Sequence, residues 1–321
     1  MDINKNLIEN AFHSKILLFG EYGIIQDAMG LSIPFESFNG KLSFREHSVK
    51  PDEEKIKASN ENLRKYATHL ENLQEKAGLN VQFDLKRMKD DLDSGMFFES
   101  TIPQGFGVGS SGALCAAIYD RYAKDKLQPQ ELKKKKLKEL KIIFAQMESY
   151  FHGTSSGMDP LICYINMPVL IESKNDIDTV SLPKDQKEGR GAIFLLDSGT
   201  PGKTQPLVKY FMERCKEKDF LEKCKADFIP YNDNCIRGFL KGETKALFYN
   251  LYFLSKFLIE NLTPMIPHIF HRLWKEGLDT GAYYLKLCGS GGGGFILGFT
   301  EDLENAKKYL KGHQIKVIQR F

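Results

Sequence analysis

The sequence predicts an α+β fold with two lobes, and three observations support this prediction. The chain has 321 residues, enough for two domains that each bury a core. Its composition, 42% hydrophobic and 27% charged, is that of an ordinary globular protein. Strand-like and helix-like segments come in clusters, without the strict alternation that a parallel βαβ sheet requires.

Apolar periodicity places the elements of the first half of the chain. Leu63, Tyr66 and Leu70 share one face of a helix expected over 54–77, which Gly78 would end. Strands are expected at 15–19, 31–35, 41–44, 81–85 and 96–100, and further helices at 111–126 and 129–151.

The second half repeats the mixture of strands and helices. Strands are expected at 168–171, 192–196, 283–287, 294–299 and 315–319, and helices at 203–216, 220–237, 243–261 and 302–311. The polar stretch 173–191 between them is the predicted boundary loop, which gives domains over 1–175 and 176–321.

Charge and cysteine content exclude several classes of protein. The net charge of +3 is too close to balance to indicate binding to nucleic acid or a membrane. No apolar run approaches the roughly 20 residues of a membrane span, and the first 14 residues carry no signal sequence. The six cysteines lack zinc-ligand spacing, so a cytoplasmic protein with reduced thiols is expected.

The most informative segment is Pro103–Ala113, which reads PQGFGVGSSGA and leads into a predicted helix. Its glycines, Gly105, Gly107, Gly109 and Gly112, allow positive φ and a close approach of the backbone to a ligand. Backbone N–H groups at such a turn and helix start form an anion site, and the hydroxyls of Ser110 and Ser111 can donate to phosphate or bind Mg²⁺. Alone, the segment is equally consistent with an ordinary glycine-rich turn.

Two common nucleotide motifs do not account for this loop. Residues 107–112 and 289–294 both satisfy G-x-G-x-x-G, but Pro103 interrupts the approach, and the charged run 131–141 stands where a second buried strand should follow. Residues 199–204 end in GKT, but Asp197 occupies the position of the first glycine of a Walker A loop.

Three more segments have the composition of a phosphoryl-transfer site. They are KILLFGEY at 15–22, ESYFHGTSSGMD at 148–159 and KLCGSGGGG at 286–294. Together with the glycine loop they resemble the GHMP kinase family, whose motifs P-x-G-x-G-[hydrophobic]-G-S-S-x-A and K-L-T-G-[AS]-G-G-G-G they match in order. Within that family, the segment at 148–159 is most similar to the H-G-x-x-S-G-x-D motif of the mevalonate kinases.

The resemblance implies a fold and an activity. The N-terminal domain would be an ATP-binding lobe like domain 2 of ribosomal protein S5, and the C-terminal domain a ferredoxin-like lobe. The enzyme would use ATP and Mg²⁺ to phosphorylate a small-molecule hydroxyl, with mevalonate as acceptor in isoprenoid precursor synthesis. The sequence leaves the oligomeric state open, with a homodimer as one option. Alternatives are a relative that acts on phosphomevalonate or another hydroxy acid, a decarboxylating relative, and a catalytically silent nucleotide-binding regulator.

The resemblance also implies roles for charged residues. Asp159 would lie beside the acceptor hydroxyl as a general base or electrostatic guide, and Lys15 would stabilise the negative charge of the transferred phosphate. Glu21 would pair with and orient Lys15. Ser111 and Glu148 would be the Mg²⁺ ligands.

Other positions follow from the same resemblance. The glycine loop would wrap the ATP phosphates, while Gly289 and Gly291 would shape the cleft near phosphates and substrate. Thr204 would contact the substrate. Tyr22 stands where the family has a histidine near the substrate, Ser155 and Pro160 replace the usual proline and asparagine, and Cys288 replaces a threonine. These departures leave the identity of the acceptor open.

Overall fold

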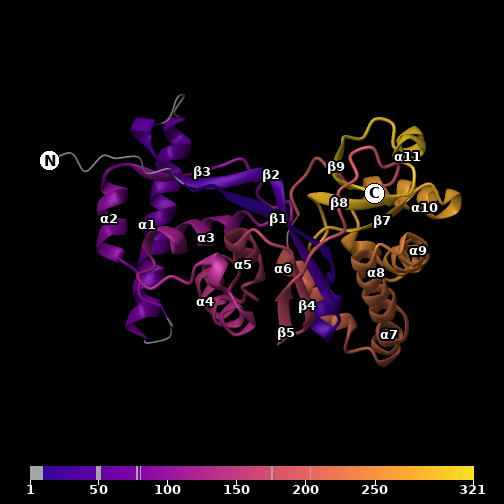
Figure 1. Ribbon diagram of the computed structural model, residues 1–321, viewed down its shortest axis with the longest axis horizontal. Helices are drawn as coiled ribbons and strands as arrows, with labels where there is room; N and C mark the ends of the chain where they lie inside the picture. The colour runs from indigo at the N-terminus through magenta and orange to yellow at the C-terminus, as the bar shows by residue number, and fades with distance from the viewer. Residues whose placement is uncertain (1–9, 48–51, 77–78, 80, 175, 203) are drawn as a thin grey trace. The chain divides into compact units, whose positions relative to one another are not determined.

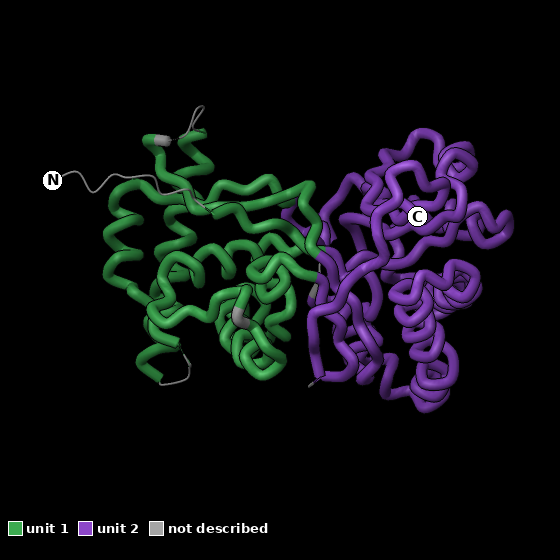
Figure 2. Tube along the Cα trace, in the orientation of Figure 1, with its two compact units in different colours: residues 1–15, 34–102, 109–167 green, residues 16–33, 103–108, 168–321 purple. Residues whose placement is uncertain are grey.

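The computed structural model describes residues 10–47, 52–76, 79, 81–174, 176–202 and 204–321. These residues form two compact units, each assembled from separate stretches of chain (Figure 2). Unit 1 comprises residues 1–15, 34–102 and 109–167, and unit 2 comprises residues 16–33, 103–108 and 168–321. The expected domain boundary at 175/176 stays a prediction.

Unit 1 is built from antiparallel strands and a set of packed helices (Figure 1). Its elements are the first part of β1 (Phe12–Phe19), the second part of β2 (Gly30–Phe44), β3 (Met96–Ser100), α1 (Glu53–Glu75), α2 (Leu85–Asp93), α3 (Ser110–Tyr122), α4 (Lys134–His152) and α5 (Met158–Ile165). β3 pairs antiparallel with β2 through residues 40–44. The ring of Tyr119 on α3 packs against Phe144 of α4 and Tyr164 of α5, which joins the three helices in one core.

Unit 2 contains a four-stranded antiparallel sheet of order β7-β8-β6-β9. Its strands are β6 (Ala192–Asp197), β7 (Tyr284–Leu287), β8 (Phe295–Thr300) and β9 (Ile315–Arg320), and its helices are α6 (Thr204–Arg214), α7 (Lys218–Lys223), α8 (Ile229–Lys241), α9 (Thr244–Asn261), α10 (His268–Thr280) and α11 (Leu303–Tyr309). β4 (Val169–Ser173) pairs with residues 30–32 of β2 and with β5 (Asp176–Thr179). The mixture of antiparallel sheets and helices confirms the predicted α+β class.

Most predicted elements are present, and the structure differs from the prediction at a few places. The strands expected at 31–35 and 41–44 are one continuous strand, β2. The strand expected at 81–85 is absent, because the Asp84 carboxylate accepts from the Arg87 N–H and starts α2 at Leu85. The helix expected over 220–237 is interrupted by a π-helical turn at Cys224–Phe228. Gly78, the expected helix end, lies outside the described residues, and β5 lies within the stretch expected to be a loop.

Candidate active site

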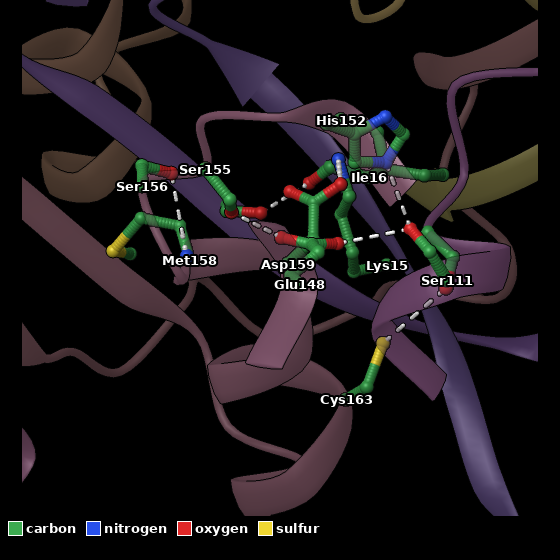
Figure 3. A network of polar contacts seen from close by, with 12 residues as sticks. Lys15, Ile16, Ser111, Glu148, His152, Ser155, Ser156, Met158, Asp159 and Cys163 are labelled. Carbon is green, nitrogen blue, oxygen red and sulfur yellow. Dashed lines mark hydrogen bonds and ion pairs between the residues drawn. The ribbon is translucent and has the colours of Figure 1, made fainter. Parts of the chain in front are cut away.

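The centre of the site in unit 1 is an ion pair between Lys15 and Asp159. Lys15 is on β1, and its Nζ lies 2.8 Å from Oδ2 of Asp159 in the first turn of α5 (Figure 3). The lysine side chain is 5% exposed, whereas that of Asp159 is 39% exposed. A buried ammonium group therefore holds a carboxylate that remains accessible to a ligand.

Two glycines let α3 approach this ion pair closely. Gly109 precedes the helix with φ +84°, and a Cβ atom there would lie 2.9 Å from Cγ of Lys15. A Cβ atom on Gly112 would lie 2.8 Å from the carbonyl carbon of Asp159. Both contacts are too short for a side chain, so these glycines allow the helix start, whose first N–H groups have no acceptor within the helix, to lie next to Lys15 and Asp159.

A hydrogen-bonded cluster around Glu148 forms the other part of the site. The Ser111 hydroxyl donates to Oε1 of Glu148 over 2.9 Å, and the Ser155 hydroxyl donates to Oε2 over 2.5 Å (Figure 3). Ser111 Oγ also lies 3.1 Å from Nε2 of His152. Sequence reasoning missed His152 and Ser155 as members of this cluster, although both stand in the segment that supplied Glu148 and Asp159.

Burial and a neighbouring charge change the acidity of Glu148. The residue is only 4% exposed, and its burial, together with the negative charge of Asp159, raises the pKa of its carboxyl group to about 7. The hydrogen bonds from Ser155 and Ser111 and the charge of Lys15 oppose this rise in pKa. The site thus holds two carboxyl groups that repel each other when both are ionised.

The donor set of this cluster fits Mg²⁺. The described residues contain no group of three or more His, Cys, Asp and Glu side chains that could hold a metal ion. Mg²⁺ needs fewer protein ligands, because it keeps several waters and takes one or two carboxylates together with phosphate oxygens. Ser111 and Glu148 provide neighbouring hard oxygens, and a cation there would relieve the repulsion between Glu148 and Asp159.

In unit 2 the first half of the glycine loop, residues 103–108, packs backbone to backbone against the segment 288–294, which contains the second glycine run (289–294). A Cβ atom on Gly107 would lie 2.8 Å from the Cys288 carbonyl oxygen, and one on Gly289 would lie 3.3 Å from Cα of Gly107. The Gly105 carbonyl accepts from the N–H of Gly202 over 2.8 Å. Gly291 has φ +75°, and a Cβ atom on it would lie 2.4 Å from the Met265 carbonyl oxygen.

A second lysine–carboxylate pair lies beside these loops. Lys286 Nζ is 2.5 Å from Oε1 of Glu21 and also donates to the Leu287 carbonyl over 2.8 Å. Sequence reasoning gave Lys286 no role, although a lysine inside the apolar strand YLKL was a signal that it needs a buried partner. The expected pairing of Glu21 with Lys15 stays a prediction.

The structure thus divides the predicted site residues between the two units. Lys15, Gly109, Ser110, Ser111, Gly112, Glu148 and Asp159 lie in unit 1, and Glu21, Tyr22, Gly105, Gly107, Gly289 and Gly291 lie in unit 2. Thr204 begins α6, but its side chain lies outside the described part of the chain.

Among the described residues, none of the helices combines the length and the apolar character that a membrane-spanning helix requires.

Comparisons with known structures agree with this architecture. Mevalonate kinase from L. major, in complex with R-mevalonate, is 16% identical, with 98% of this chain and 97% of that chain covered and a TM-score of 0.64. Phosphomevalonate kinase from Streptococcus pneumoniae is 13% identical, with 97% and 100% covered and a TM-score of 0.62. Galactokinase from Lactococcus lactis, complexed with galactose, is 12% identical, with 99% and 95% covered and a TM-score of 0.62.

Family models give the assignment. A search of curated proteins found no match. The model of the GHMP kinase N-terminal domain matches residues 62–166, and the model of the GHMP kinase C-terminal domain matches residues 244–314. Together they cover more than half of the sequence and include α3, Glu148 and Asp159. The chain belongs to the GHMP kinase family, which indicates an ATP-dependent kinase that acts on a hydroxyl group.

Proposed function

We propose that this protein transfers the γ-phosphoryl group of ATP to the hydroxyl group of a small acid, with mevalonate as the acceptor. The observation that carries the proposal is the Lys15–Asp159 pair, in which a buried ammonium group holds an accessible carboxylate 2.8 Å away. The Ser111–Glu148 pair completes the charge pattern of a phosphoryl-transfer site.

Each charged residue has a distinct task in this proposal. The Asp159 carboxylate accepts a hydrogen bond, and then the proton, from the acceptor hydroxyl. The hydroxyl oxygen attacks the γ-phosphorus of ATP while the bond from this phosphorus to the leaving oxygen of ADP breaks. The Lys15 ammonium keeps this carboxylate in place and stabilises the negative charge that spreads over the transferred phosphoryl oxygens. The low exposure of Lys15 strengthens that stabilisation, because little water screens its charge.

The glycine loop and the Glu148 cluster are suited to hold the nucleotide. Backbone N–H groups at the start of α3 carry partial positive charge that would attract the phosphates, and Ser110 would add a hydroxyl there. Mg²⁺, held by Ser111 and Glu148, would neutralise phosphate charge when bound. The Ser111 hydroxyl donates its proton to Glu148, so Nε2 of His152 donates to the Ser111 oxygen and orients it.

Support for mevalonate comes from the segment at 148–159 and from the likeness in fold to a kinase bound to R-mevalonate. Likeness to a phosphomevalonate kinase and to a galactokinase makes phosphomevalonate and galactose the alternatives to be tested. The N-terminal residues 1–175 would carry the ATP site, and residues 176–321 would form the second domain.

The test is a coupled assay of ADP release with ATP and Mg²⁺ against a panel of acceptors. The panel contains mevalonate, phosphomevalonate, homoserine, galactose and a control without acceptor. Release with mevalonate alone is the expected result. Release with another acceptor would contradict the choice of mevalonate and retain the kinase reaction, while ATP binding without release from any acceptor would favour a regulatory protein.

A further inference from the structure

The turn that carries Glu21, Tyr22 and Gly23 in unit 2 has an unusual backbone. Tyr22 has φ +61° and ψ −37°, and the Gly23 N–H donates to the Glu21 carbonyl over 2.6 Å. This bond between residues two apart, around a central residue of positive φ, is close to a classic γ-turn, which is rare and strained. Because tyrosine has no intrinsic preference for such a backbone, contacts elsewhere must hold it there.

Among the described residues, two polar side-chain contacts join this turn to the segment 286–290. Glu21 binds Lys286, and the Tyr22 hydroxyl donates to the Ser290 carbonyl over 2.5 Å. The Tyr22 ring also packs on Phe211 at a centroid distance of 4.9 Å, and burial raises the pKa of the Tyr22 hydroxyl well above its usual range. The hydroxyl therefore remains a donor at any physiological pH.

The residues bound by the turn lie on either side of the contact with the glycine loop. Lys286 and Ser290 lie on either side of Cys288 and Gly289 in the sequence. A side chain on Gly107 would clash with the Cys288 carbonyl oxygen, and Gly289 lies in van der Waals contact beside it. A displacement of the Ser290 carbonyl would thus change the surface on which the first half of the glycine loop rests. The contacts run without interruption from the γ-turn to the glycine loop, all within unit 2.

We propose that Tyr22 is a positioning residue for the nucleotide: its strained turn clamps the 286–290 segment, which in turn fixes the phosphate-binding glycine loop. This inference rests on the proposed function, since it takes the glycine loop as the ATP phosphate site. The expectation that Tyr22 lies near the acceptor stays a prediction, and the clamp rests on the bond from the Tyr22 hydroxyl to the Ser290 carbonyl.

The test compares Tyr22→Phe with the matched variant Tyr283→Phe. Tyr283 is also buried in unit 2, and its hydroxyl donates to the Leu273 carbonyl over 2.9 Å, so each variant loses one hydrogen bond from a tyrosine hydroxyl to a backbone carbonyl. Calorimetry measures the affinity for AMPPNP with Mg²⁺, and hydrogen exchange measures protection of the peptide 288–294, where Gly292 and Gly294 donate to Met265 and Thr200. Thermal melting verifies that both variants fold.

Tyr22→Phe should bind AMPPNP about fivefold more weakly and exchange the 288–294 amides several-fold faster, the loss expected for one hydrogen bond. Tyr283→Phe should change neither, and KM for the acceptor should stay unchanged in both. Unchanged exchange, unchanged nucleotide affinity, or a rise confined to the acceptor KM would each overturn the clamp. An unmodified protein that fails to bind AMPPNP would instead overturn the proposed function, and the clamp with it.

Discussion

The two lysine–carboxylate pairs of this protein have similar contacts and different surroundings. Lys15 and Lys286 are both enclosed, with side chains 5% and 2% exposed, and each lies within 2.8 Å of its carboxylate. The carboxylates differ, since Asp159 is 39% exposed and Glu21 is 5% exposed. An accessible carboxylate can take a proton from a substrate, whereas an enclosed one can only hold the chain in place.

The same contrast extends to the backbone around each pair. Near Lys15, the absence of side chains at Gly109 and Gly112 allows the N-terminus of α3 to lie close to the Lys15–Asp159 ion pair. At Lys286, the space left by Gly107 and Gly289 is filled by backbone from the opposing loop. The arrangement at Lys15 is suited to binding a ligand, whereas the arrangement at Lys286 is suited to stabilising a loop.

The largest expected effect of a mutation is on the accessible pair. Asp159→Asn should lower kcat by about 10²- to 10⁴-fold, because the amide cannot accept the proton of the acceptor hydroxyl. Its oxygen still accepts from Lys15, and the nearby Glu148 carboxylate leaves that ammonium group a counter-charge, so stability should fall less than for variants of the enclosed Lys286–Glu21 pair. Steady-state kinetics with saturating ATP and acceptor measure the effect.

Asp120→Asn is the control for this variant, since Asp120 forms a 2.6 Å pair with Lys126 elsewhere in unit 1. The control should retain the kcat of the unmodified protein. If Asp159→Asn turned over at a near-normal rate, Asp159 would not be the proton acceptor.

Mutations of the enclosed Lys286–Glu21 pair should lower the stability of the protein. Lys286→Met or Glu21→Gln alone should lower the free energy of unfolding by about 3–5 kcal/mol, because each leaves one partner buried without its counter-charge. The double variant should recover much of this loss, since an uncharged pair incurs no such penalty. Urea denaturation of the four proteins measures the coupling, and simple additivity of the two losses would show that the pair does not act as a unit.

The residues at the accessible site could be predicted because local sequence carries them. Ser111, Glu148 and Asp159 each stand in a short segment of characteristic composition, and the structure brings these segments together in unit 1. The helix α5, which has Pro160 in its first turn, is not among the helices predicted from the sequence. Proline is tolerated in the first turn of a helix, where its missing N–H has no intrahelical acceptor.

The partner of Lys286 could not be predicted in the same way. Glu21 lies 265 residues away in the sequence, so the pairing depends on tertiary structure alone. The γ-turn at Tyr22 also gave no sequence signal, because such turns normally select glycine and not tyrosine. The strand expected at 81–85 is not formed for a local reason. Val81 and Phe83 are buried in the alternating pattern of a strand, but Asp84 caps α2, which begins at Leu85.

A smaller effect should separate Glu148 from both pairs through its dependence on pH. Its folded-state pKa of about 7 exceeds the unfolded value of 4.5, so the folded protein binds more protons between these values. The contribution of Glu148 to the free energy of unfolding is therefore fully present below about pH 4.5. It is lost as pH rises to about 7, by an amount on the order of 3 kcal/mol in the absence of metal.

Glu148→Gln keeps the shape of the side chain and removes its titration, so the free energy of unfolding of this variant should fall less over this range. Urea denaturation in chelator at pH 5 and pH 8 measures the difference between the two proteins, and equal falls in stability would show that Glu148 stays ionised in the folded state.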